Sequence, residues 1–229
     1  MKTLFFAIFL LMTYSATFAQ NNPAGKVLIT SACASGGDDY YFFEGGKVIA
    51  QCSGCEDIVL VKTGLWKDLG KGKYALTWEK IYRAKPAGKI IAAASVNIYD
   101  NYVAVSEKTS SKETVSLQID KNSCEKIETH QKKFDPHFFL RTDYQGNFSF
   151  ASEREISEDE LAGLSRAELG IMRNEIFARY GYSFKSEAVK EYLSRQKNYS
   201  DRSLSDVAAF LSEIEQKNIL KIKAEEAKR

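Results

Sequence analysis

The character of the chain changes near residue 152, and this change constrains its fold more than any other feature of the sequence. From residue 26 to about residue 149, short apolar and β-branched runs alternate with glycine-containing turns, a pattern typical of β-strands. From residue 152 onward, apolar residues recur at the three- and four-residue spacing of helices. We therefore predict a segregated α+β fold, with a β domain over residues 26–150 and a small helical bundle over residues 153–226.

The N-terminal part contains about eight or nine strand-like runs joined by short connections without helical periodicity. Because parallel strands need long crossovers, we expect these strands to form an antiparallel meander. Two hairpins are indicated, one turning at Glu44-Gly45-Gly46 and the other at Gly70-Lys71-Gly72. Closing the meander into a small barrel, or folding it into a sandwich, would protect its edge strands.

Three serines mark helix starts in the C-terminal part, because each is followed three residues later by a glutamate. The pairs are Ser157 with Glu160, Ser165 with Glu168, and Ser212 with Glu215. In such a capping box the serine oxygen accepts from the backbone N–H three residues on, and the glutamate accepts from the serine N–H. The second box opens the longest predicted helix, over residues 166–180. Two further helices are expected over residues 187–195 and 213–226.

Residues 1–19 have the order of a cleavable signal peptide. Lys2 precedes an apolar run over residues 4–12, and Ala19 supplies the small residue at the cut. This run is too short to cross, as a helix, a bilayer core of about 30 Å. No later run approaches the length of about 18 apolar residues that a membrane helix needs. The sequence thus predicts export through the secretory pathway and a soluble mature chain without a transmembrane segment, either periplasmic or extracellular.

The four cysteines indicate two disulfides, because an exported chain meets an oxidising compartment. Cys52 and Cys55 flank a turn-like Ser-Gly pair, which favours a local bridge between them. Cys33 and Cys124 would then close a loop of about ninety residues. A thioredoxin-type redox site would need its CxxC at a helix start, and a zinc site would need a second closely spaced pair. Neither pattern is present, so we predict no metal and no cofactor.

Charge and motifs argue against two classes of function. The formal net charge of +2 leaves no basic excess for phosphates, so we expect no nucleic-acid partner. His130 and His137 are the two histidines of the chain, and both fall in a loop-like stretch. No metalloprotease helix, phosphate loop, dinucleotide fingerprint or nucleophile elbow occurs. We assign no catalytic residue, although a Ser-His-Asp arrangement around these histidines stays open.

The longest predicted helix carries the sequence Arg-Asn-Glu-Ile-Phe-Ala-Arg-Tyr-Gly-Tyr at residues 173–182. This stretch resembles the YARHG domain, a module of exported bacterial proteins that is named for its five-residue motif. The family pattern also has an aromatic residue after the motif, here Phe184, and a late helix rich in Glu, Asn and Ile, here residues 212–219. Two motif positions depart, since Phe177 stands for tyrosine and Tyr180 for histidine. The resemblance covers residues 153–226 and implies a fold and an exported location, but no reaction.

The polar residues of this stretch are expected to form either a structural latch or a partner-binding surface. They are Arg173, Asn174, Glu175, Arg179, Tyr180 and Gly181. Asn174 is unfavourable inside a helix, which suggests that its side chain holds a neighbouring backbone segment. Glu175 and Arg179 have the spacing of an ion pair along the helix, and Arg173 can clamp a carboxylate. Gly181 lies where a helix ends in a left-handed residue.

A weaker resemblance concerns residues 63–66, Thr-Gly-Leu-Trp, which together with the following Gly-Lys-Gly turn are similar to a segment of lipocalin-type barrels. It implies that Trp66 and Trp78 line a cavity for a small apolar ligand, whereas a barrel filled by its own side chains is the simpler alternative. Three hypotheses follow. The favoured one is a non-catalytic cell-envelope or secreted binding module whose partner is unknown. The alternatives are a lipocalin-like carrier and a hydrolase acting on envelope polymers.

Overall fold

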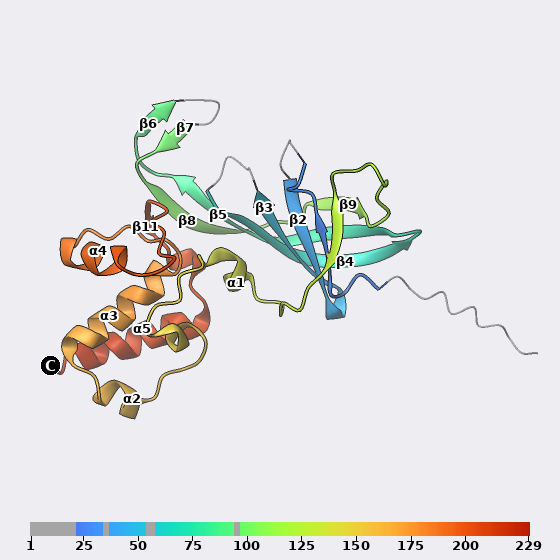
Figure 1. Cartoon of the computed structure of the whole chain (residues 1–229). Coiled ribbons are helices and arrows are strands. Elements are labelled where there is room, and N and C mark those ends of the chain that lie inside the picture. The colour runs from blue at the N-terminus through green and yellow to red at the C-terminus, as the bar shows by residue number, and fades with distance from the viewer. Residues whose placement is uncertain (1–21, 34–36, 54–57, 94–96) are drawn as a thin grey trace, which may run out of the picture.

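The computed structural model describes residues 22–33, 37–53, 58–93 and 97–229 of the chain. The predicted signal peptide over residues 1–19 and Cys55 lie outside the described residues. Strands come first along the chain and helices follow, which confirms the predicted α+β class. Figure 1 shows the helices gathered beside one end of a long sheet, with a short helix between the two parts.

The main sheet has nine strands and does not close into a barrel within the described residues. Its strands are β1 (Lys26–Ile29), β2 (Gly37–Phe43), β3 (Lys47–Ser53), β4 (Leu60–Gly70), β5 (Lys73–Pro86), β8 (Tyr102–Lys108), β9 (Lys112–Ser116), β10 (Lys126–Thr129) and β11 (Leu204–Asp206). The spatial order is β10-β1-β2-β3-β4-β5-β8-β11, and β9 pairs with the first half of β5. Both predicted hairpins are present: a 3-10 turn, η1 (Glu44–Gly46), joins β2 to β3, and a tight turn joins β4 to β5.

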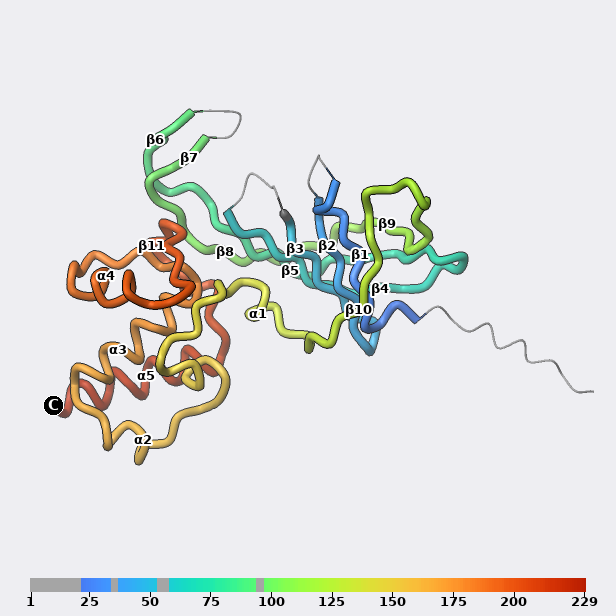
Figure 2. The backbone as a smooth tube through the Cα atoms, in the orientation of Figure 1, coloured from blue at the N-terminus to red at the C-terminus, as the bar shows by residue number. Residues whose placement is uncertain are grey.

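The strand pairs of the N-terminal part are antiparallel, as the meander predicted, but β11 adds a parallel pair at one edge. β11 belongs to the helical part and pairs with β8, where Leu204 lies opposite Tyr102. A parallel pair needs a long crossover, and here the helices between the two strands provide it. The tube in Figure 2 follows this return of the chain to the sheet edge.

Alternation along the strands gives the sheet two apolar faces with separate cores. One face holds Phe42, Val48, Leu76 and Trp78, and the sheet curls over it. Glu113 of β9 accepts from the Trp78 indole N–H of the paired β5 at 3.0 Å, and across the curled face it also accepts from the Tyr40 hydroxyl of β2. The structure is therefore sandwich-like, and its interior on this face is filled by its own side chains.

The disulfide between Cys33 and Cys124 is present, as predicted, with a Cα–Cα distance of 5.2 Å. It joins the turn after β1 to the loop before β10, two strands that already pair with each other. Cys52 lies near the end of β3, and its predicted partner lies outside the described residues.

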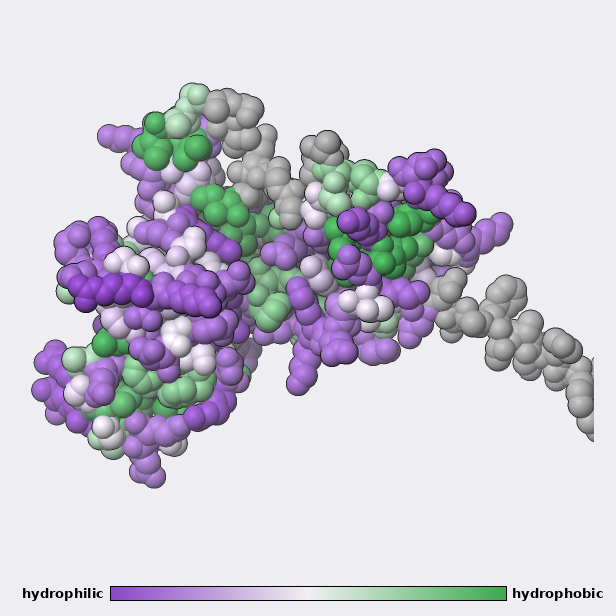
Figure 3. All heavy atoms as spheres, viewed as in Figure 1, coloured by the Kyte–Doolittle hydropathy of each residue, from purple (hydrophilic) through white to green (hydrophobic). Residues whose placement is uncertain are grey.

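A smaller hairpin, β6 (Ile90–Ala93) and β7 (Asn97–Tyr99), forms a two-stranded sheet of its own. Ile90, Ile91 and Ile98 are all at least half exposed. Figure 3 shows apolar surface gathered on this hairpin at the upper left of the view. Tyr99 connects the hairpin to the main sheet, since its ring centroid lies 5.9 Å from that of the buried Tyr102 of β8.

The helical part contains α1 (Pro136–Leu140), α2 (Glu158–Ala162), α3 (Arg166–Ala178), α4 (Glu187–Ser194) and α5 (Glu213–Glu226), with two 3-10 turns, η2 (Ser149–Ser152) and η3 (Ala208–Phe210). All three predicted capping boxes are confirmed, with both reciprocal hydrogen bonds, at the starts of α2, α3 and α5. α3 ends two residues earlier than predicted, and α5 has the predicted bounds. Among the described residues, no helix is long and apolar enough to cross a membrane.

The second face of the sheet shares one core with the helices. Ile49 and Tyr82 of the sheet belong to the same buried cluster as Met172 and Ile176 of α3 and Ile222 of α5. Phe139 and Leu140 place α1 in this cluster between the two parts. The packing of the helical part against the sheet therefore fixes the orientation of α3, whose polar side chains form the candidate site.

Candidate partner-binding site

Glu175 is a buried carboxylate that ties three segments together. Its Oε1 accepts hydrogen bonds from the hydroxyls of Tyr144 (3.0 Å) and Tyr192 (2.6 Å) and from the backbone N–H of Asn147 (3.0 Å). Its Oε2 accepts from the N–H of Phe148 (2.8 Å). Burial, together with the hydrogen bond to Glu175, raises the pKa of Tyr192 to about 12. Glu175 thus connects α4 and residues 144–148 to α3 by hydrogen bonds.

Tyr180 belongs to a second buried network. Its hydroxyl donates to Oε2 of Glu215 at 2.6 Å, and the Arg141 guanidinium donates to Glu215 Oε1 at 3.0 Å and to the Tyr180 oxygen at 3.3 Å. Tyr180 and Glu215 have no exposed surface, and burial raises the pKa of Tyr180 well above its usual value. Glu215 also closes the capping box of α5 with Ser212. The position where the family pattern has histidine is therefore a buried structural position.

The predicted ion pair between Glu175 and Arg179 does not form, because Glu175 turns into the tyrosine cluster instead. The buried Arg179 donates to the carbonyl oxygen of Ser149 at 2.9 Å and lies 3.8 Å from the exposed carboxylate of Glu153. It thereby holds η2 against the end of α3. Arg179 acts as a latch, but with other partners than its spacing indicated.

Asn174 does not hold a backbone segment, since its side chain makes no hydrogen bond with any residue that the structure describes. That role belongs to the fully buried Asn218 of α5. Its Oδ1 accepts from the N–H of Ile156 at 3.0 Å, and its Nδ2 donates to the carbonyl oxygens of Ala151 (2.8 Å) and Arg154 (2.7 Å). Asn218 was not predicted for this role, although it is an asparagine inside a predicted helix, as Asn174 is.

Gly181 follows α3 with a φ of +79°, as its predicted place at the helix end requires. A Cβ atom at this position would lie 2.6 Å from Cγ of Arg202. Glycine is therefore needed both for the left-handed backbone and for the close approach of Arg202.

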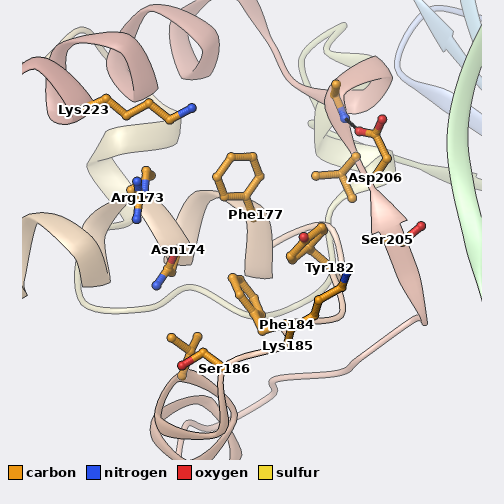
Figure 4. A pocket seen from close by; sticks show the side chains of 13 residues that line it. Arg173, Asn174, Phe177, Tyr182, Phe184, Lys185, Ser186, Ser205, Asp206 and Lys223 are labelled. Carbon is orange, nitrogen blue, oxygen red and sulfur yellow. Dashed lines mark hydrogen bonds between the residues drawn. The ribbon is translucent and has the colours of Figure 1, made fainter.

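Arg173 and Asn174 face away from these networks and line a pocket of about 590 Å³ between α3, α4, α5 and β11. Figure 4 shows Phe177 in the middle of this pocket, with Tyr182 and Phe184 beside it. The ring centroids of Phe177 and Tyr182 are 5.8 Å apart, and those of Tyr182 and Phe184 are 4.8 Å apart. Phe177 and Tyr182 are partly exposed, so solvent reaches this aromatic surface, whereas Phe184 is buried beside them.

The rim of the pocket is predominantly cationic. Arg173 forms an ion pair with Glu226 at 2.9 Å, while Lys185 and Lys223 are exposed and form no ion pair with the described residues. Asp206 is the acidic residue of the rim, and its carboxylate already accepts from the N–H of Ala208 at 2.8 Å. The pocket therefore offers an aromatic surface beside two cations that lack a counter-charge.

Trp66 and Trp78 do not line a common cavity among the described residues. Trp78 is buried in the filled core of the curled sheet face. Trp66 donates its indole N–H to the Phe43 carbonyl oxygen at 3.1 Å and borders a hollow of about 650 Å³ with Leu65 and Lys112. Trp66 also packs against the core that contains Trp78, and it borders the hollow without Trp78.

The two histidines each bind a backbone carbonyl oxygen. Nε2 of His130 lies 3.1 Å from the Phe42 oxygen, and Nδ1 of His137 lies 2.7 Å from the Phe210 oxygen. In the part of the chain that the structure describes, neither ring contacts a serine hydroxyl, and no group of three or more His, Cys, Asp or Glu could hold a metal ion. The histidines also lie outside the pocket beside α3.

Comparison with known proteins identifies the helical part. Residues 147–227 match the family model of the YARHG domain. No curated protein and no solved structure matches the chain. The matched range contains every residue that lines the pocket, together with Glu175, Tyr180, Glu215 and Asn218 of the buried networks. The C-terminal part of this chain is a YARHG domain.

Proposed function

We propose that the protein is a non-catalytic, exported bacterial binding module, and that its YARHG domain holds a segment of a partner protein in the pocket beside α3. One observation carries this proposal. The buried Glu175 of α3 and Arg179 directly after it bind neighbouring segments of the fold, whereas Arg173 and Asn174 face an aromatic pocket open to solvent. A purely structural role would not require a pocket that solvent can enter. The open pocket therefore supports a binding role for the side of α3 that carries Arg173 and Asn174.

The chemistry of the pocket indicates what the partner segment contains. Phe177, Tyr182 and Phe184 provide the aromatic surface on which an apolar or aromatic anchor residue packs. Lys185 and Lys223 at the rim favour acidic residues on either side of that anchor, because complementary charges steer encounter and fix register. We therefore expect an extended segment in which acidic residues flank an aromatic or aliphatic one.

The location in the envelope or outside the cell rests on three features. They are the predicted signal peptide over residues 1–19, the disulfide between Cys33 and Cys124, and the YARHG domain. Disulfides persist in compartments outside the cytoplasm, where reducing systems do not break them. The partner is accordingly expected in the same compartment.

A selection from random displayed peptides against the full mature chain tests the proposal. Enriched sequences should carry acidic residues around an apolar anchor. Their affinity should fall about tenfold or more for the variant Lys185→Glu/Lys223→Glu, because two rim cations then repel the acidic flanks. Isothermal titration calorimetry with a synthesised winning peptide measures this change.

The matched control is Lys121→Glu/Lys126→Glu, which makes the same change in net charge at exposed lysines of the sheet part. This control should bind the peptide like the wild type at equal ionic strength. The proposal is abandoned if the winning peptides bind both double variants equally well, or if selection enriches no sequence that depends on Lys185 and Lys223.

A further inference from the structure

A second polar cavity lies in the seam between the sheet and the helical part. It has a volume of about 310 Å³ and is lined by Gln51 of β3, by Lys132 and Arg141 on either side of α1, and by Arg179 after α3. A neighbouring hollow of about 480 Å³ shares Gln51 and Arg141 with it and adds Arg202. α1 marks the position of this seam in Figure 2.

Cationic side chains dominate the seam. Lys132, Arg141, Arg179 and Arg202 line it, and Asp143 is the acidic residue among the lining side chains. Two of these cations already face carboxylates outside the cavity lining, Arg141 with Glu215 and Arg179 with Glu153. Lys132 and Arg202 form no ion pair with the residues that the structure describes. Asp39 and Asp143 attract Lys132 and Arg202 from a distance, but neither carboxylate forms an ion pair with them.

The arginines of the seam are also short of acceptors. The side chain of Arg179 is more than nine-tenths buried, and its Nε has no hydrogen-bond partner among the described residues. Arg202 donates one hydrogen bond, to the Leu140 carbonyl oxygen at 2.7 Å. Burial lowers the pKa of both guanidinium groups, and the nearby Arg141 adds to this effect at Arg179. A bound anion would supply negative charge and acceptors.

Lys132 is held in a way that leaves its N–H donors available. Its ammonium lies over the rings of Tyr41, Phe139 and Phe138, at 4.5, 4.7 and 5.0 Å from the ring centroids. Cation–π contacts of this kind fix the position of an ammonium without using its hydrogen atoms in conventional hydrogen bonds. The lysine thus borders the cavity as a positioned cation.

We propose that this seam is a binding site for a ligand that carries an oxyanion, either a carboxylate or a phosphate. Lys132 and Arg202 supply cations that form no ion pair with the described residues, and Arg141 and Arg179 form the buried wall. Asp143 provides an acceptor for a hydroxyl or amine of the same ligand, so a sugar acid or a sugar phosphate fits better than a bare dianion. This site lies outside the aromatic pocket beside α3 and shares no lining residue with it.

Calorimetric titration of the full mature chain with three probes tests the proposal: inorganic phosphate, glycerol 3-phosphate and glucuronate, each at the same ionic strength. At least one probe should bind and raise the melting temperature above a sodium chloride reference. Binding of the phosphates alone identifies a phosphate ligand, and binding of glucuronate alone identifies a carboxylate ligand. If no probe binds more tightly than chloride, the site does not exist.

Two lysine variants and one pocket variant make the test specific. Lys132→Met keeps the apolar contacts of the side chain and should weaken the bound probe about tenfold, because one charge-assisted hydrogen bond is lost. Lys133→Met, at an exposed neighbour, should leave the dissociation constant unchanged. Equal affinity in wild type and Lys132→Met would overturn the assignment. Lys185→Glu/Lys223→Glu should retain probe binding, so this test is independent of the peptide experiment.

Discussion

At the scale of single residues, two buried carboxylates of the YARHG domain connect separate segments by hydrogen bonds. Glu175 accepts four hydrogen bonds from two segments, and Glu215 joins an arginine, a tyrosine and a helix N-terminus. A buried carboxylate persists only where its oxygens are satisfied, and its removal leaves the donors around it unpaired. We therefore expect these residues to contribute to stability.

Replacement of Glu215 by glutamine should lower the free energy of unfolding by about 3 kcal/mol or more, because Arg141 would keep a buried charge without its counter-ion. Urea denaturation followed by circular dichroism measures the change. Glu160→Gln is the matched control, since Glu160 also closes a capping box and pairs with an arginine, but at an exposed site. Its loss of stability should be several times smaller. If both variants lose a similar free energy of unfolding, the buried contacts of Glu215 with Arg141 and Tyr180 add no stability beyond that of the capping box.

His130 should make stability depend on pH. Its Nε2 donates to the Phe42 carbonyl oxygen, and its Nδ1 accepts from the N–H of Lys132 at 3.2 Å, which suits the neutral ring. Burial lowers the pKa of His130 below its usual value of 6.5. The folded state thus binds this proton less readily than the unfolded state. The stabilisation is complete above pH 6.5 and declines as the pH falls below that value.

The measurement is the melting temperature between pH 7.5 and pH 5, together with NMR titration of the ring protons of His130. His130→Gln, which cannot take up the proton, should show a shallower decline over the same interval. An NMR pKa at or above 6.5 for His130 would contradict the prediction.

At the scale of elements, the ends of α3 decide what the helix can display. Ser165 and Glu168 fix its start, and Gly181 lets the chain turn so that Tyr182 and Phe184 come back beside Phe177. The aromatic surface of the pocket is thus a consequence of how the helix ends. The same turn admits Arg202, which borders the seam on the other side.

Gly181→Ala should lower the free energy of unfolding by more than about 2 kcal/mol, since a left-handed alanine costs about 1–2 kcal/mol and the Cβ would also displace Arg202. Gly45→Ala is the control, because Gly45 has a φ of +69° but nothing within 4 Å of its Cβ position. Gly45→Ala should lower the free energy of unfolding only by the cost of the left-handed backbone, about 1–2 kcal/mol. If thermal or urea denaturation gives equal losses for both alanines, the close packing of Arg202 against Gly181 has no energetic weight.

At the scale of the whole molecule, the two parts share one core and one sheet. Residues of β3, β4 and β5 pack with α3 and α5, and β11 extends the sheet from the helical side. The boundary near residue 152 that the sequence suggests stays a prediction about domain organisation. η2, at that boundary, packs against both α3 and α5. Experiments on the domain should accordingly use the full mature chain.

The double variant Cys33→Ser/Cys124→Ser should be less stable than the wild type by up to about 4 kcal/mol, because the bridge restricts a long loop in the unfolded chain. Differential scanning calorimetry measures the loss. The double change avoids leaving a single unpaired thiol of this bridge. The same melting temperature in both proteins would show that the pairing of β1 with β10 alone fixes this edge of the sheet.

Much of the secondary structure could be predicted from the sequence, because its signals are local. The three capping boxes, the two hairpin turns and the left-handed Gly181 each depend on a few neighbouring residues. The partners of the polar side chains were predicted less well. Arg179 binds Ser149 and not Glu175, and Asn218 performs the role expected of Asn174. Spacing along one helix indicates which side chains of that helix can contact each other. The partners actually bound here come from segments distant in the sequence.

The sequence by itself determined the order of strands and helices, the helix starts and the resemblance to the YARHG domain, since these follow from periodicity, turn residues and a contiguous motif. Only the tertiary structure decided which side of α3 is buried, that β11 joins the sheet, and that cations from four separate segments line one seam. The physical reason is that a pocket forms where elements far apart in the chain pack together. Its charge and shape are properties of that packing, which no local pattern encodes.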